Sequence, residues 1–119
     1  MRRVAFCAIM PVIIDPWRYG MVIIYCEMHI DAEKKAEYFE RVRAAGIIPA
    51  TNAEPGCLSY ELAECAAEPG KLLIVERWES PAALPAHMKG ANYAALMKLN
   101  AEYGLKGGAA VYTAEPMAK

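Results

Sequence analysis

Apolar and polar residues alternate from residue 21 to residue 30, where the chain reads MVIIYCEMHI. This period of two, rich in β-branched residues, predicts a half-buried strand. The face expected to meet the core carries Val22, Ile24, Cys26, Met28 and Ile30. The opposite face is mixed, so it suits either solvent or a cavity. It carries Ile23, Tyr25, Glu27 and His29.

The next pattern is helical. Residues 32–45 are good helix formers, and Asp31 is a suitable N-cap in front of them. Gly46 and Pro49 are expected to disturb the end of this helix, and Pro55-Gly56 predicts a turn after it. The predicted apolar stripe of the helix consists of Ala36, Tyr38, Phe39 and Val42.

A hairpin is predicted after that turn. Residues 57–65 alternate again, with Leu58, Tyr60 and Leu62 expected on one face. The turn sequence AAEPGK connects them to a second apolar strand over residues 72–79.

The last third of the chain predicts a broken helix and one strand. Ser80 is the expected N-cap, with Pro81 at the first helical position. Pro85 should distort the first turn and Gly90 should interrupt the helix, which resumes from residue 93 to 103. Gly107-Gly108 then leads into a final strand over residues 109–115.

The order strand, helix, strand, strand, helix, strand predicts an α+β, ferredoxin-like βαββαβ fold. Both helices should cover one face of four antiparallel strands, and the other face must be solvated or meet a second copy. Ile23, Ile74 and Trp78, at expected outer positions, favour a homodimer.

The first 20 residues lie outside this pattern. Arg2-Arg3 precedes an apolar run, as in a secretory signal, but Pro11 interrupts the run and no cleavage site follows. We expect an N-terminal extension, either an added strand over residues 4–14 or the result of an upstream start codon. The domain is expected to span residues 21–119.

Composition limits the classes of function. The 119 residues, 56% hydrophobic and 23% charged, suffice for one compact domain. A formal net charge of −1 supplies no basic field for nucleic acid. No apolar run approaches the roughly 20 residues needed to cross a bilayer. We therefore expect a cytoplasmic protein that binds neither nucleic acid nor membrane.

Cysteine and histidine spacing does not indicate a metal site. The four cysteines, Cys7, Cys26, Cys57 and Cys65, form no CxxC pair, and His29 and His87 are far apart. Buried, reduced thiols are the expected state of the cysteines in the apolar strands.

The candidate chemistry centres on the corner between the second hairpin strand and the following helix. Trp78 could donate its indole N–H to a substrate oxygen, or could simply close the end of the core. His87 could act as a base, because imidazole titrates near neutral pH, or could bond a carbonyl and fix the corner. Glu27 and Tyr25 are alternative proton acceptors or donors, or occupy an interface or a solvated position.

The segments EPGCLSYEL (54–62) and ERWES (76–80), followed by Leu84 and His87, resemble the antibiotic biosynthesis monooxygenase family. The resemblance covers roughly residues 21–115. It implies a dimeric α+β barrel, with a pocket between sheet and helices that opens toward an aromatic substrate. The quinol-oxidising members use neither metal nor flavin, so the resemblance implies no cofactor.

A cofactor-independent monooxygenase acting on a small quinol or phenolic compound with O₂ is therefore the expected function. Such an enzyme must remove a proton, stabilise the resulting anion and exclude water. The expected catalytic residues are His87, Glu27 and Trp78. The expected substrate-binding residues are Tyr25, Tyr60, Ile74, Leu84 and Tyr93, although Tyr60 also suits the core.

The polyketide-oxidising branch of the family carries an Asn and a Tyr where this chain has Ile74 and Leu84, so only Trp78 of that set is present.

Two alternatives to the quinol monooxygenase stay open. One is a haem-degrading monooxygenase, a branch that uses an Asn on the first strand and a His on the second helix. Residues 21–30 offer no Asn, and Leu96-Met97 occupy the middle of the second helix. The other alternative is a non-enzymatic dimeric α+β barrel that binds small hydrophobic molecules.

Overall fold

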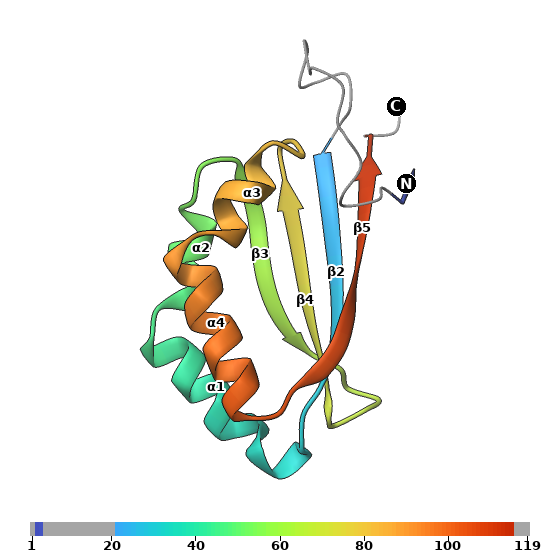
Figure 1. The fold of residues 1–119 in the computed structure, drawn as a ribbon. Helices are drawn as coiled ribbons and strands as arrows, with labels where there is room; N and C mark the ends of the chain where they lie inside the picture. Colours follow the sequence, from blue (N-terminus) through green and yellow to red (C-terminus); the bar gives the residue numbers. More distant parts are fainter. Residues whose placement is uncertain (1, 4–20, 116–119) are drawn as a thin grey trace.

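The computed structural model describes residues 2–3 and 21–115 (Figure 1). Its strands are β1 (Arg2–Arg3), β2 (Met21–His29), β3 (Cys57–Glu64), β4 (Lys71–Trp78) and β5 (Lys106–Ala114). Its helices are a 3₁₀ turn (Ala32–Lys34), α1 (Lys35–Ala44), α2 (Ile47–Asn52), α3 (Ala83–Met88) and α4 (Ala91–Glu102). From β2 onward the order confirms the predicted α+β, ferredoxin-like βαββαβ fold.

The sheet has the strand order β1-β5-β2-β4-β3, and every neighbouring pair is antiparallel. The helices lie together on one face of it (Figure 1). The two-residue strand β1 adds to the edge at β5. The strand expected over residues 4–14 lies outside the described residues, and the boundary at Met21 stays a prediction.

The register corrects the expected outer face. Ile74 pairs with Cys26, and Trp78 pairs with Val22, so both side chains share the face that packs against the helices. Ile74 is only 3% exposed and Trp78 is fully buried. Of the three residues expected to favour a dimer from the outer face, only Ile23 lies there.

A β-bulge alters the alternation predicted for the first hairpin strand. The pairing with β4 shifts between Cys57 and Ser59, which leaves Leu58 without a place in the ladder and 49% exposed. Tyr60, after the bulge, is buried as expected. The bulge therefore separates Leu58 from the face that Tyr60 and Leu62 share.

The helix boundaries follow the expected turn residues, with two corrections. Asp31 caps the 3₁₀ turn by accepting a hydrogen bond from the Glu33 N–H, and Gly46, at φ 65°, separates α1 from α2. Ser80 is not an N-cap, because it closes a turn in which its carbonyl accepts from Ala83, where α3 begins. Gly107-Gly108 lies within β5 rather than before it.

The core has two connected parts between sheet and helices. The larger part lies under α1, α2 and α4, and its most buried members are Tyr38, Ile47, Leu72 and Leu96. Ala36, which was expected in the α1 stripe, is exposed. The smaller part lies under α3 and consists of Val22, Ile24, Trp78 and Leu84. None of the helices formed by residues 21–115 has the length and apolar character that a membrane crossing requires.

Candidate active site

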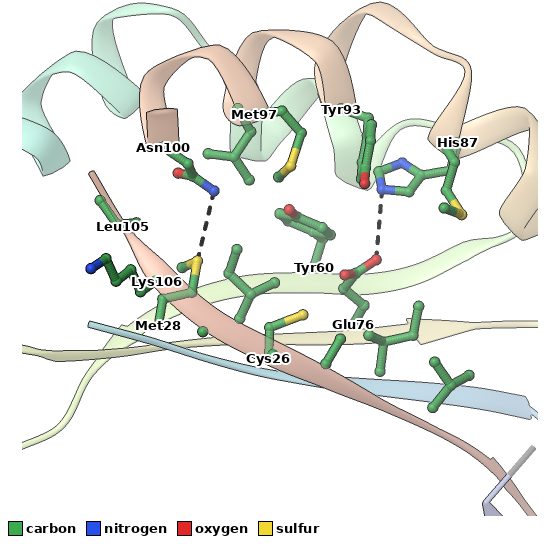
Figure 2. Close-up of a pocket in the computed structure, with 18 residues that line it drawn as sticks. Cys26, Met28, Tyr60, Glu76, His87, Tyr93, Met97, Asn100, Leu105 and Lys106 are labelled. Carbon is green, nitrogen blue, oxygen red and sulfur yellow. Dashed lines mark hydrogen bonds and ion pairs between the residues drawn. The ribbon is translucent and has the colours of Figure 1, made fainter. Parts of the chain in front are cut away.

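A cavity of about 380 Å³ lies between the inner face of the sheet and helices α3 and α4 (Figure 2). Its floor comes from all the long strands, and its roof comes from the two helices. Met88 and Met97, at 40% and 39% exposure, lie where the cavity meets solvent. The cavity lining includes Cys26, Met28, Tyr60, Ile74, Glu76, His87, Tyr93 and Asn100.

Three ionisable side chains form a chain at one end of the cavity. His87 Nδ1 lies 3.0 Å from Glu54 Oε1, and His87 Nε2 lies 3.7 Å from Glu76 Oε1. The second oxygen of Glu54 accepts a hydrogen bond from Asn92 Nδ2 at 3.0 Å. In the tautomer that carries its proton on Nδ1, His87 donates to Glu54, and Nε2 is the nitrogen that faces Glu76 and the cavity.

Trp78 stands behind this chain. Its indole Nε1 donates to Glu76 Oε1 at 2.9 Å, and its ring centroid lies 4.7 Å from that of His87. Trp78 is fully buried and is not among the residues that line the cavity. It therefore holds Glu76 and His87 in position without facing the cavity itself.

Tyr60 and Tyr93 flank the imidazole on the cavity side. The ring centroids of Tyr60 and Tyr93 lie 5.9 and 5.5 Å from that of His87. Tyr60 sits on the edge strand β3, where its backbone N–H and C=O both bond the Asn52 side chain, at 2.9 and 3.0 Å. Helix α2 thus fixes the strand at the residue that enters the cavity.

Burial controls protonation inside the cavity. Burial raises the pKa of Glu76, and Glu54 adds to the rise, while the Trp78 N–H and the charge of His87 oppose it. Burial, followed by the charge of Glu76, raises the pKa of the Cys26 thiol to about 11. The same two causes raise the pKa of Tyr60. Cys26 and Tyr60 therefore stay protonated at neutral pH.

The structure brings together only part of the predicted site. His87, Tyr60, Ile74 and Tyr93 line one cavity. Leu84 and Trp78 lie in the core beneath α3, away from the cavity surface. Tyr25 and Glu27 point to the opposite face of the sheet, where Glu27 pairs with Lys71 Nζ at 3.3 Å.

Sequence reasoning assigned no role to Glu76 and Glu54. The sequence does mark Glu76, because it is the one acidic residue on the inward face of β4, which it shares with Leu72, Ile74 and Trp78. Buried carboxyls at such positions are rarely without a partner. Glu54 had no such signal, because it reaches His87 across 33 residues through the fold.

The arrangement suits acid–base chemistry on a flat, mainly apolar molecule. An imidazole held by a carboxylate on one nitrogen can take up a proton on the other, and the carboxylate stabilises the cation that forms. Glu76 offers a second acceptor beside it. Over residues 2–3 and 21–115, no group of three or more His, Cys, Asp or Glu side chains is arranged to hold a metal ion.

Solved structures share this fold. A candidate antibiotic biosynthesis monooxygenase from Deinococcus radiodurans superposes with a TM-score of 0.72 at 24% identity, covering 82% of this chain and 96% of its own. A protein of Mycobacterium tuberculosis gives 0.61 at 26% identity, with coverage of 84% and 98%. A conserved protein of Bacteroides thetaiotaomicron gives 0.71 at 18% identity, with coverage of 81% and 99%.

Comparison with curated proteins finds no match. The family model for antibiotic biosynthesis monooxygenases matches residues 21–99, which include β2, the β3–β4 hairpin and the three linked side chains Glu54, Glu76 and His87. This match agrees with the shared fold and with the resemblance carried by residues 54–62 and 76–80. The chain belongs to the antibiotic biosynthesis monooxygenase family.

Proposed function

We propose that the protein is a cofactor-independent monooxygenase that oxidises a small quinol or phenolic compound with O₂. Membership of the family supports a monooxygenase-like function in general. The observation that carries the finer proposal is the chain Glu54–His87–Glu76 at one end of an apolar cavity. This chain supplies proton acceptors for the hydroxyl of an aromatic compound bound in the cavity, which supports the proposal.

The proposed reaction starts with proton transfer from the substrate hydroxyl to His87 or Glu76. The aromatic anion then gives one electron to O₂, and the radical pair recombines to a peroxide anion within the cavity, which takes the proton back from the side chain. Loss of water from the peroxide leaves, from a quinol and O₂, a hydroxylated quinone and one water. Tyr60, Tyr93 and Ile74 would hold the ring and limit the access of water.

Oxygen consumption by metal-free, flavin-free protein tests the proposal, with 1,4-dihydroxynaphthalene and related quinols as substrates. We expect turnover above the protein-free background. His87→Ala should lower the rate by about 100-fold or more, the usual scale for a general base. The matched control is His29→Ala, because His29 is exposed at the end of β2 and should leave the rate unchanged.

Two results would count against the proposal. If His87→Ala and Glu76→Gln both keep the full rate, the assigned proton acceptors are wrong. If aromatic ligands bind but none is oxidised, the non-enzymatic barrel becomes the better account of the cavity.

A further inference from the structure

The end of the cavity opposite His87 carries a polar side chain that takes no part in the proposed reaction. Figure 2 shows Asn100 of α4 at that end, with Tyr60 between it and the Glu76–His87 pair. The amide oxygen of Asn100 accepts a hydrogen bond from the Tyr38 hydroxyl at 2.6 Å. Its amide nitrogen donates to the Met28 thioether sulfur at 3.7 Å (Figure 2).

Tyr38 determines which way this amide points. The Tyr38 side chain is fully buried, and burial raises its pKa to about 12, so its hydroxyl keeps its proton and remains a donor. A donor at the amide oxygen leaves the nitrogen as the end that faces the cavity. A thioether is a weak acceptor, so the two N–H groups of Asn100 can donate to a stronger acceptor in the cavity.

Polar groups at both ends of an otherwise apolar cavity suit one flat molecule with an oxygen at each end. Tyr93, whose ring centroid lies 5.5 Å from that of His87, precedes Asn100 by seven residues on α4, a rise of about 10.5 Å along the helix axis. An aromatic ring system with oxygens at opposite ends, with a hydrogen bond at each end, spans about 11 Å. The stretch between them is lined mainly by apolar side chains.

We infer that Asn100, oriented by Tyr38, is a specificity-determining residue that donates a hydrogen bond to a second oxygen of the substrate, opposite the hydroxyl at His87. The substrate class is then a one- or two-ring aromatic compound with oxygens at opposite positions. Compounds with a single hydroxyl would bind only at the His87 end. The inference rests on the proposed function, which places the reacting hydroxyl at His87.

Anaerobic calorimetry tests the inference without any oxidation step. The ligands are 1,4-dihydroxynaphthalene, with opposite oxygens, and 1-naphthol, which lacks the second oxygen. Asn100→Leu should weaken binding of 1,4-dihydroxynaphthalene by about 10-fold, the scale of one hydrogen bond, and leave 1-naphthol unchanged within about twofold. Tyr38→Phe, which frees the amide, should weaken the first ligand by a smaller factor and spare the second.

Met97→Leu is the matched control, because Met97 lines the cavity on the same helix but offers no N–H donor. It should change the affinity for both naphthols by the same factor. The inference is overturned if Asn100→Leu changes the affinities for both ligands equally, or changes neither, and Tyr38→Phe also affects both ligands equally. Thermal unfolding of each variant shows whether it is folded. If Asn100→Leu is unfolded, the affinities of Tyr38→Phe for the two ligands decide the inference.

The two proposals fail in different ways. If His87→Ala loses oxygen consumption while Asn100→Leu affects both ligands equally, the proposed function stands and the role of Asn100 is rejected. If Asn100→Leu selectively loses 1,4-dihydroxynaphthalene binding but the wild-type protein consumes no oxygen, the role of Asn100 stands and the monooxygenase proposal is rejected.

Discussion

Glu76 shows how a single buried side chain can link stability to pH. Its carboxyl is 6% exposed, accepts a hydrogen bond from Trp78 and faces His87. Because its pKa in the folded protein lies above the ordinary value of 4.5, the folded state holds this proton more tightly than the unfolded state does. The contribution of Glu76 to stability is complete below that value and is lost as the pH rises through the folded pKa.

Glu76→Gln should therefore remove the free-energy cost of burying an ionised carboxylate, which grows with pH. Glutamine keeps an oxygen for the Trp78 N–H but carries no charge to be buried. We expect the melting temperature of Glu76→Gln to exceed that of the wild type by a margin that grows as the pH rises above 4.5 toward neutrality. Thermal unfolding from pH 4 to pH 8 measures this margin, and a constant difference would show that Glu76 is not the titrating group.

At the scale of elements, the contact between β5 and β2 depends on one glycine. Gly107 lies opposite Met28 in the antiparallel ladder. A Cβ built on Gly107 would lie 1.8 Å from the carbonyl oxygen of Glu27, whereas one on Gly108 would meet nothing within 4 Å. The two adjacent glycines thus differ in whether the structure has room for a side chain, although both line the cavity.

Gly107→Ala should lower the free energy of unfolding by about 3 kcal/mol or more, because the backbone of β5 must move away from β2. Gly108→Ala should change it by less than about 0.5 kcal/mol. Urea denaturation of the two variants measures both values. Equal stability of the two variants would contradict the close approach at Gly107.

At the scale of the whole molecule, no helix formed by residues 21–115 covers the sheet face opposite α1 to α4 (Figure 1). It carries a patch of half-buried apolar residues on β2, β4 and β5, in which Ile23 pairs with Tyr112 and Tyr25 with Val75. Leaving apolar surface in water costs about 25 cal/mol per Å². We propose that a second copy covers this face and makes a homodimer.

Light scattering should then give twice the 13.1 kDa of one chain at micromolar concentration. Val75→Glu, which places a charge in the patch, should give a monomer because an unpaired charge is costly to bury. The control Ala44→Glu adds the same charge at an exposed position on α1 and should leave the mass unchanged. A wild-type monomer would end the dimer proposal.

Local patterns in the chain were sufficient to predict the fold. The alternation at residues 21–30, the hairpin turn before Lys71 and the helix breaks at Gly46 and Gly90 all depend on near neighbours, so they can be recognised in the sequence. His87, Tyr60 and Tyr93, which were expected at the site, line the cavity, while their catalytic and substrate-binding roles stay predictions.

Only the tertiary structure decided which residues face the cavity. Period-two alternation gives two faces but does not say which one the helices cover, so Tyr25 and Glu27 were placed on the site and Ile74 and Trp78 on the outside. The bulge at Leu58 and the partners of His87 depend on contacts far apart in the chain. The sequence by itself determined the elements and their order, while packing of α3 and α4 on the sheet brought Glu54, Glu76 and His87 together.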